Sequence, residues 1–170
     1  MLRVDLRELA RDGAVETQGE LRQDDAALEG TELRLQEPVT VRGRLQSIGE
    51  GRFYWQGTAR TVVQGDCRRC LIPVATPLQL EIGALFTQDL DALDDPDSYS
   101  VAPDATEIDV TAAVREELVL AAPRFMACRD DCKGLCPQCG KDLNAGPCDC
   151  TPAADARWQP LQALKDKLRS

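Results

Sequence analysis

Hydrophobic and polar residues alternate along the middle of the chain, and this alternation predicts strands that are buried on one face. Residues 39–46 read VTVRGRLQ, with an apolar residue or glycine at every second position. Residues 53–64 alternate in the same way, and residues 74–86 place Leu, Ile, Ala and Phe on one face. Because a period of two belongs to strands, we predict an antiparallel β-meander, either a sheet or a partly closed barrel. Pro77 favours an edge position or a bulge in the third strand.

Outside these strands the pattern predicts short helices and exposed connections. Residues 2–11 favour a short strand followed by a helical turn, whereas the polar residues 12–32 favour a long exposed loop or hairpin. Residues 87–109 carry eight acidic residues and no basic one, which predicts an exposed acidic linker. Asp109 is a suitable N-cap for a helix over residues 110–122. The apolar stripe of that helix is Val110, Val114, Leu118 and Ala121.

The pattern divides the chain into two parts. We predict a β-rich domain over residues 1–122, which contains the acidic linker and the helix over residues 110–122. Residues 123–170 form a cysteine-rich segment that ends in a short helix docked onto the body. The apolar face of that last helix consists of Trp158, Leu161, Leu164 and Leu168. The fold class expected is α+β, with short helices and a small C-terminal zinc knuckle.

The composition and motifs of the chain exclude several kinds of catalytic, metal-binding and membrane-spanning protein. The chain has 170 residues and no histidine, which excludes Ser–His and Cys–His nucleophile pairs and every metal site that needs imidazole. Nucleotide-binding glycine motifs and the GxSxG motif are absent from the sequence. The N-terminus lacks the apolar core of a secretory signal, and no apolar stretch is long enough to span a membrane. We therefore expect a cytoplasmic protein with reduced cysteines, no membrane contact and no small-molecule substrate.

The net charge of −9 is unevenly distributed along the chain. Acidic residues concentrate in residues 1–32 and 87–122, whereas residues 33–86 and 123–170 are mildly basic. Acidic loops of this kind keep a small protein in solution, and they also suit a basic partner such as a ribosomal protein. The opposite interpretation is contact between arginines and RNA or another partner. The arginines considered for it are Arg42, Arg44, Arg60, Arg68 and Arg69.

Six of the eight cysteines lie in the run CRDDCKGLCPQCGKDLNAGPCDC. Cys136 and Cys139 form a C-x2-C-G zinc-knuckle half, in which both thiolates reach one ion and the glycine permits the turn. Cys148 and Cys150 are the preferred second half, because the loop before them can fold back as a hairpin. The spacing predicts a closed, structural thiolate zinc site. Cys128 and Cys132 are alternative ligands, free thiols and an iron–sulfur cluster being the other interpretations.

The remaining pair, Cys67 and Cys70, flanks Arg68 and Arg69 between two strands. One C-x2-C supplies only half a zinc site, so the pair is either structural or a partner contact, part of a second metal site, or a ligand pair for the C-terminal group. Neighbouring cations lower thiol pKa values, which leaves a redox role open. No helix start follows the pair, unlike the arrangement in thioredoxin-type proteins.

Four stretches in this order resemble the YceD-like family, the large ribosomal RNA subunit accumulation protein family. They are GDCRRCL, DVTAAVREELVLAAP, CRDDCKGLCPQCGKDLNAGPCDC and DARWQPLQALK. The resemblance spans roughly residues 35–168, and Ala156 departs from it where the family usually has proline. Some members lack the C-terminal cysteines but keep the Cys67–Cys70 pair. The resemblance thus implies that the metal is an optional stabiliser and that the pair lies nearer the shared function.

The resemblance implies a non-enzymatic factor that supports accumulation or maturation of large-subunit (23S) ribosomal RNA and ribosome assembly. Its partners would be that RNA, ribosomal proteins or assembly factors. Two alternatives from the residues themselves are a metal-dependent nuclease and a thiol-based metal-delivery or redox protein. The nuclease would use the acidic run Asp89, Asp91, Asp94, Asp95 and Asp97.

Overall fold

The computed structural model describes residues 2–49, 51–89 and 98–151. Its elements follow one another along the chain as strands interrupted by two α-helices and one 3-10 turn. They are β1 (Arg3–Asp5), α1 (Leu6–Asp12), β2 (Ala14–Leu21), η1 (Ala26–Leu28), β3 (Val39–Gly49), β4 (Arg52–Asp66), β5 (Pro73–Thr87), β6 (Ser98–Ser100), β7 (Glu107–Asp109) and α2 (Thr111–Ala121).

The main sheet has the strand order β2-β3-β4-β5-β6. All its pairs are antiparallel except β5 with β6, and β1 pairs with β7 in a separate two-stranded sheet. The three strands predicted from the alternating pattern are β3, β4 and β5, and they form an open sheet rather than a closed barrel. Pro77 pairs on one side with Val62 of β4, while β6 contacts only the last residues of β5.

Two of the expected connections are wrong in part. Of the loop or hairpin expected over residues 12–32, residues 14–21 form β2, an edge strand paired antiparallel with β3, so this part is not an exposed loop. The acidic linker contains β6 and β7, and Ile108 is buried in the core. In both places a few inward side chains and backbone hydrogen bonds to a neighbouring strand outweigh the polar composition. The rest of the acidic run, residues 90–97, lies outside the described residues, as does the expected C-terminal helix.

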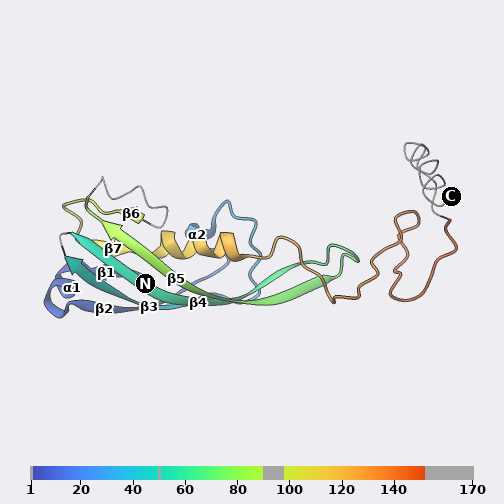
Figure 1. Ribbon diagram of the computed structural model, residues 1–170, viewed down its shortest axis with the longest axis horizontal. Helices are drawn as coiled ribbons and strands as arrows, with labels where there is room; N and C mark the ends of the chain where they lie inside the picture. Colours follow the sequence, from blue (N-terminus) through green and yellow to red (C-terminus); the bar gives the residue numbers. More distant parts are fainter. Residues whose placement is uncertain (1, 50, 90–97, 152–170) are drawn as a thin grey trace, which may run out of the picture.

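The core lies on one face of the sheet, which is covered by the helices and the β1–β7 pair (Figure 1). Trp55 is fully buried there, and its Nε1–H donates a hydrogen bond to Thr17 Oγ1 at 2.9 Å. Gly43 and Gly57 face each other across β3 and β4, where a Cβ atom would lie 2.7 and 2.5 Å from the indole ring. The two glycines therefore make the space for the tryptophan.

Helix α2 packs Val114 and Leu118 into this core, as its apolar stripe predicts. The helix begins one residue later than expected, with Val110 as the N-cap, and Asp109 Oδ1 accepts a hydrogen bond from the Thr111 N–H at 2.9 Å. Ala121, which the stripe included, is exposed. Within the described residues, no helix combines the length and the apolar character that a membrane span requires.

The hairpin of β4 and β5 extends well beyond the end of β3 (Figure 1). We call residues 61–78, the part of the hairpin past the last β3 pair, the arm. The segment after α2 runs along this arm, where Met126 forms a parallel bridge with Cys67. The chain between α2 and the cysteine-rich run is thus fixed to the tip of a hairpin formed much earlier in the sequence.

Candidate metal centres

The tip of the arm is a tight turn built around Cys67 and Cys70. The Leu71 N–H donates to the Cys67 carbonyl at 2.8 Å, and the Cys67 N–H donates to the Ile72 carbonyl at 2.8 Å. Leu71 lies in the left-handed region with φ 62°, a conformation that a branched side chain rarely adopts. The turn directs the two thiols to the same side.

The chain after α2 brings Cys128 and Cys132 to this turn. Arg68 N–H donates to the Met126 carbonyl at 2.9 Å, which aligns the two segments. The guanidinium of Arg69 donates through Nη1 to the carbonyls of Asp130 and Cys132, both at 2.9 Å. The Arg69 side chain therefore binds the backbone of the incoming loop, and these two hydrogen bonds do not involve the side chains of that loop.

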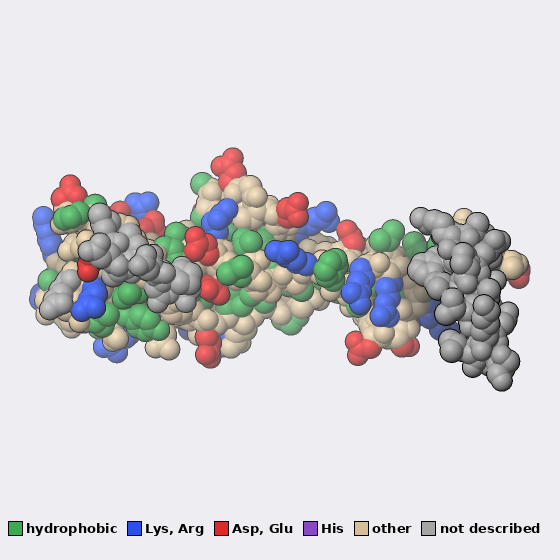
Figure 2. All heavy atoms as spheres, turned by 45° about the horizontal axis from the view of Figure 1, so that its top comes forward, with side chains coloured by type: hydrophobic (Ala, Val, Ile, Leu, Met, Phe, Trp, Pro, Cys, Tyr) green, Lys and Arg blue, Asp and Glu red, His purple; other side chains and the backbone are tan. Residues whose placement is uncertain are grey.

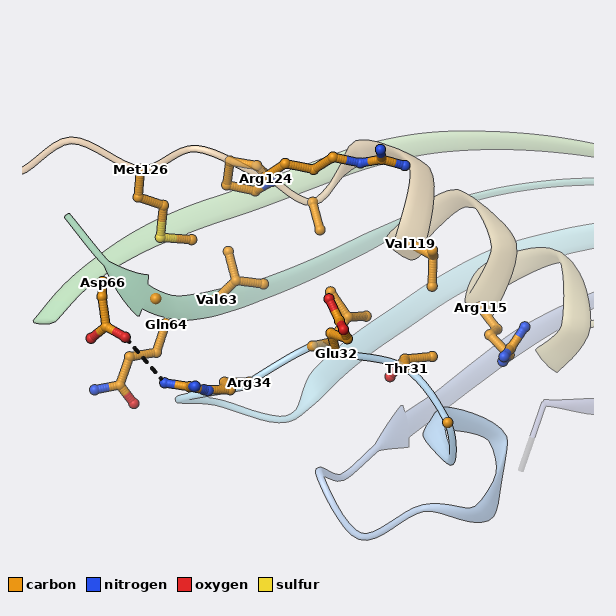
Figure 3. Close-up of a pocket in the computed structure, with 15 residues that line it drawn as sticks. Thr31, Glu32, Arg34, Val63, Gln64, Asp66, Arg115, Val119, Arg124 and Met126 are labelled. Carbon is orange, nitrogen blue, oxygen red and sulfur yellow. Dashed lines mark hydrogen bonds and ion pairs between the residues drawn. The ribbon is translucent and has the colours of Figure 1, made fainter. Parts of the chain in front are cut away.

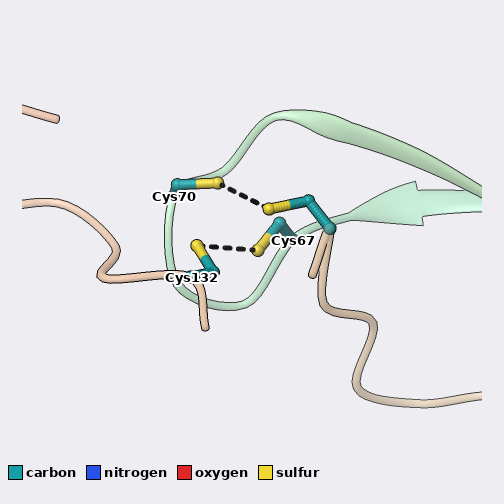
Figure 4. A group of neighbouring side chains, drawn as sticks. Cys67, Cys70 and Cys132 are labelled. Atoms are coloured by element: carbon teal, nitrogen blue, oxygen red, sulfur yellow. Dashed lines mark hydrogen bonds between the residues drawn. The ribbon is translucent and has the colours of Figure 1, made fainter. Parts of the chain in front are cut away.

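The four sulfurs of Cys67, Cys70, Cys128 and Cys132 lie within 4.8 Å of one another, and we call these residues the arm group (Figure 4). The separation is 3.9 Å between the sulfurs of Cys67 and Cys132, and 3.6 Å between those of Cys70 and Cys128. A disulfide would need about 2.05 Å. Four thiolates at about 2.3 Å from one zinc ion have their sulfurs about 3.8 Å apart, so the arm group has the size of a tetrahedral thiolate site.

The thiols of the arm group differ in acidity. Main-chain N–H groups of Cys70, Cys128 and Arg69 lower the pKa of the Cys67 thiol to about 6. Burial and the neighbouring sulfurs raise the pKa of Cys128 to about 12. The backbone thus stabilises the Cys67 thiolate, whereas Cys70 and Cys128, whose pKa values are raised, resist further negative charge. A divalent cation at the centre removes that conflict, because it stabilises all four thiolates together.

Cys136, Cys139, Cys148 and Cys150 form a second group, which we call the terminal group. Their sulfurs also lie within 4.8 Å of one another. Gly140, at φ 72°, donates its N–H to the Cys136 carbonyl at 2.9 Å, the same turn that Leu71 makes in the arm group. N–H groups of Cys139 and Gln138 lower the pKa of Cys136 to about 6, while the Cys139 sulfur and burial raise the pKa of Cys150 to about 12.

The two groups are joined by a short set of hydrogen bonds. Asn144, from the loop of the terminal group, donates through Nδ2 to Cys132 Sγ at 3.6 Å and accepts at Oδ1 from Lys133 N–H at 2.8 Å. Leu135 N–H donates to the Arg69 carbonyl at 2.9 Å, and Leu143 N–H donates to the Gly134 carbonyl at 2.9 Å. Each group is therefore a support for the other.

The donor chemistry of both groups fits a structural metal. Each group offers four sulfur ligands and no carboxylate, so four thiolates would close the coordination shell and leave no position for a substrate. Soft thiolate sets select zinc, copper(I) or iron–sulfur clusters. Backbone N–H groups directed at the sulfurs are the outer support that thiolate sites use to fix ligand orientation.

The structure brings together the four cysteines that the spacing favoured, Cys136 and Cys139 with Cys148 and Cys150. The alternates Cys128 and Cys132 lie in the arm group, as partners of Cys67 and Cys70. The sequence contained a signal for this pairing, since two incomplete halves remain once the terminal group is complete. Metal binding itself stays a prediction for both groups.

The five arginines considered for RNA or partner contact do not lie together. Arg42, Arg44 and Arg60 point from β3 and β4 to the open face of the sheet. In register with them on that face lie Glu16, Glu20 and Glu81. Three acids thus balance three arginines there, and Arg44 pairs with Glu16 at 3.8 Å. Arg68 and Arg69 lie at the arm tip.

A groove of about 1090 Å³ separates the C-terminal end of α2 from the base of the arm (Figure 3). Arg34, Arg115 and Arg124 lie around it, with Val63, Val119 and Met126 between them. Arg34 pairs with Asp66 at 3.5 Å. Sequence reasoning missed this groove, because its walls come from the loop after η1, from β4 and from the segment after α2.

With the cysteine geometry in place, comparison with known proteins identifies the family. The model of the family described as "Large ribosomal RNA subunit accumulation protein YceD" matches residues 55–165. The chain belongs to the YceD family. The match includes the arm, α2 and both cysteine groups, so the family region contains every element that holds a candidate metal ligand.

Curated relatives of this YceD chain come from bacteria and plants. It is 35% identical to the uncharacterized protein Rv2926c of Mycobacterium tuberculosis over 69% of this chain and 58% of the relative. It is 27% identical to "Large ribosomal RNA subunit accumulation protein YCED homolog 1, chloroplastic" of Arabidopsis thaliana, over 66% of this chain and 44% of the relative. Bacillus subtilis YlbN is 32% identical over 66% of this chain and 64% of that protein. The chain thus spans about half the length of its first relatives. No solved structure matches it.

Proposed function

We propose that this chain is a non-enzymatic factor that supports accumulation and maturation of large-subunit (23S) ribosomal RNA during ribosome assembly. Membership of the YceD family supports the proposal, since the family and its plant relatives are named for large ribosomal RNA subunit accumulation. The cysteine chemistry agrees with a role without catalysis, because both groups are closed thiolate sets. The protein would act in the cytoplasm, on the RNA or on its ribosomal proteins and assembly factors.

We further propose that each cysteine group holds one structural zinc ion. The sulfur separations of the arm group suit a tetrahedral thiolate site, and the terminal group has the same knuckle turn. The two ions would hold residues 123–151: the ion of the arm group would attach this segment to the arm, and the ion of the terminal group would fix the loop from Cys136 to Cys150. That segment contributes few buried apolar side chains, so metal ligation would supply what a hydrophobic core does elsewhere.

Depletion of the protein in the cells that make it tests the proposed function. We expect the ratio of 23S to 16S ribosomal RNA to fall, and free large-subunit precursors to accumulate in sucrose gradients. Re-expression of the wild-type chain should restore both quantities. An Arg11→Ala variant, altered at an exposed residue of α1 that belongs to no candidate site, serves as a control and should restore them equally.

An unchanged 23S to 16S ratio after complete depletion would contradict the proposed function. Cleavage of a 23S precursor by the purified protein, with added Mg²⁺ or Mn²⁺, would instead favour the nuclease alternative. Only Asp89 of the acidic run considered for that alternative lies among the described residues.

A further inference from the structure

Phe125 is the one exposed aromatic side chain among the described residues, at 75% of its full accessible area. The other described aromatic residues are buried or half-buried in the sheet and its edges. Leaving a phenylalanine ring in water forgoes about 2 kcal/mol of burial. A ligand that covered the ring would recover this free energy, so Phe125 marks a candidate binding surface.

Phe125 lies beside the arm, one residue before the bridge that fixes this segment to Cys67. Its neighbour Met126 forms the bridge to Cys67, and Arg68 N–H donates to the Met126 carbonyl. Met126 is only 9% exposed, so its side chain faces the arm while that of Phe125 points away from it. The backbone that presents Phe125 is fixed to the arm on one side and follows α2 on the other.

The cations next to Phe125 are available for a ligand. Arg68 and Arg124 form no ion pair with any described residue, whereas Arg34 and Arg129 are paired with Asp66 and Asp131. Figure 2 shows Lys and Arg side chains gathered along the arm, with acidic ones displaced to its upper and lower edges. This local surface is basic although the whole chain carries a net charge of −9.

The groove extends from this surface toward the body of the protein, and its charged lining consists of three arginines and the two acids Glu32 and Asp66. Arg124 lines one end of it, and Arg115, also without an ion pair to a described residue, lines the side formed by α2 (Figure 3). A nucleic-acid chain that left Phe125 along Arg124 would meet a second cation there. The outer face of the sheet offers no such path, because its arginines alternate with glutamates.

We infer that Arg68, Arg124 and Phe125 form a binding platform for single-stranded RNA, a ligand class that rests on the proposed function. An exposed aromatic ring stacks on an unpaired base of any kind, and arginines beside it contact the phosphates. Base-paired RNA keeps its bases in the helix and gains nothing from the ring. The platform therefore selects unpaired regions of ribosomal RNA by chemistry rather than by sequence.

Fluorescence anisotropy of the zinc-loaded full chain with a labelled oligoadenylate of about 12 nucleotides tests the inference. The Phe125→Ala variant should bind this probe about 5- to 150-fold more weakly, since stacking on an aromatic residue contributes about 1–3 kcal/mol per base. Phe125→Trp should retain binding and Phe125→Leu should lose it, which separates stacking from apolar contact. Leu120, at 74% exposure, provides the matched control, and Leu120→Ala should bind as the wild type does.

The arginines are tested by the salt dependence of the same binding reaction. Arg68→Ala and Arg124→Ala each remove one cation that would neutralise a phosphate. Each substitution should therefore reduce the slope of log K against log salt concentration by about 0.7. Zinc content and thermal unfolding of every variant, measured alongside, show that the fold is retained.

Equal probe affinity for wild type and Phe125→Ala would overturn the inference, as would the absence of binding or a preference for duplex RNA. A Phe125→Leu variant that binds as well as wild type would indicate apolar docking and would also overturn it. The depletion and re-expression assay of 23S RNA distinguishes failure of the binding platform from failure of the proposed function. If wild type restores the 23S ratio but does not bind the probe, the platform is wrong and the function stands; if it does not restore the ratio, the function itself is wrong.

Discussion

The arm group and the terminal group use the same four thiols but collect them over different lengths of chain. The terminal group takes all its ligands from the run between Cys136 and Cys150. The arm group joins Cys70 to Cys128, with β5, β6, β7 and α2 between them in sequence. Three of its four cysteines are buried, against one of four in the terminal group.

The difference indicates what each proposed ion would stabilise. Closing a long loop costs more chain entropy than closing a short one, so a ligand set that spans most of a domain constrains its tertiary structure. A local set constrains only its own loop. We therefore assign the attachment of the C-terminal segment to the arm group, and the shape of one surface knuckle to the terminal group.

Removing a ligand of the arm group should have the largest effect. We expect Cys132→Ser to lose one metal ion and to release the segment after α2 from the arm. Opening by only about 1.4 kcal/mol makes the released state tenfold more populated. Limited digestion with trypsin measures this as cleavage after Arg129 and Lys133 that is at least about tenfold faster than in the wild type.

The matched variant in the terminal group is Cys148→Ser. It should also lose one metal ion, but Arg129 should stay as protected as in the wild type, because the arm group still holds that part of the chain. The thermal midpoint of the β-rich domain should not change. Equal digestion of the two variants after Arg129 would contradict the division of roles.

The link between the two groups should have a smaller effect. Asn144→Ala removes the donor to Cys132 Sγ and the acceptor of the Lys133 N–H. We expect a loss of about 1–2 kcal/mol, between the contribution of a neutral hydrogen bond, about 0.5–1.5 kcal/mol, and that of a bond to a charged group, about 1.5–3 kcal/mol. Competition with a chelator would show it as a roughly tenfold faster loss of metal from the arm group, with both ions still bound at the start.

The smallest effect concerns the residue after the second cysteine of each turn, which is Leu71 in the arm group and Gly140 in the terminal group. Leu71 is 64% exposed and adopts a left-handed conformation that Gly140 adopts at no steric cost. A left-handed L-residue costs about 1–2 kcal/mol, partly offset by the entropy that glycine loses on folding. Leu71→Gly should thus raise the affinity of the arm group for metal by less than about tenfold. A decrease would show that the Leu71 side chain contributes a contact that the turn needs.

Much of the sheet follows from the sequence alone. The alternation that predicts β3, β4 and β5 persists because each of these long strands is buried on one face. Strand β2 could not be predicted in this way, because Glu16, Gln18 and Glu20 face solvent and only Thr17 and Leu21 are buried. Strands β6 and β7 are three residues each, too short to establish a period.

The cysteine groups show where sequence reasoning ends. The terminal group is a local structure, so the spacing of its residues is enough to propose it. The partners of Cys67 and Cys70 depend on how the segment after α2 runs back along the arm, which Met126 and Arg69 determine through backbone contacts. No periodic pattern in the sequence encodes those contacts. For the same reason the sequence does not show that Phe125 lies beside the arm.

Metal content per chain is the most direct test of the central claim that the two groups are separate structural thiolate sites. Elemental analysis of anaerobically purified protein should give two zinc ions for the wild type, one for Cys132→Ser, one for Cys148→Ser and none for the double variant. One zinc in the wild type that persists in Cys132→Ser would show that the arm group binds no metal. Iron in place of zinc would contradict the account of both groups.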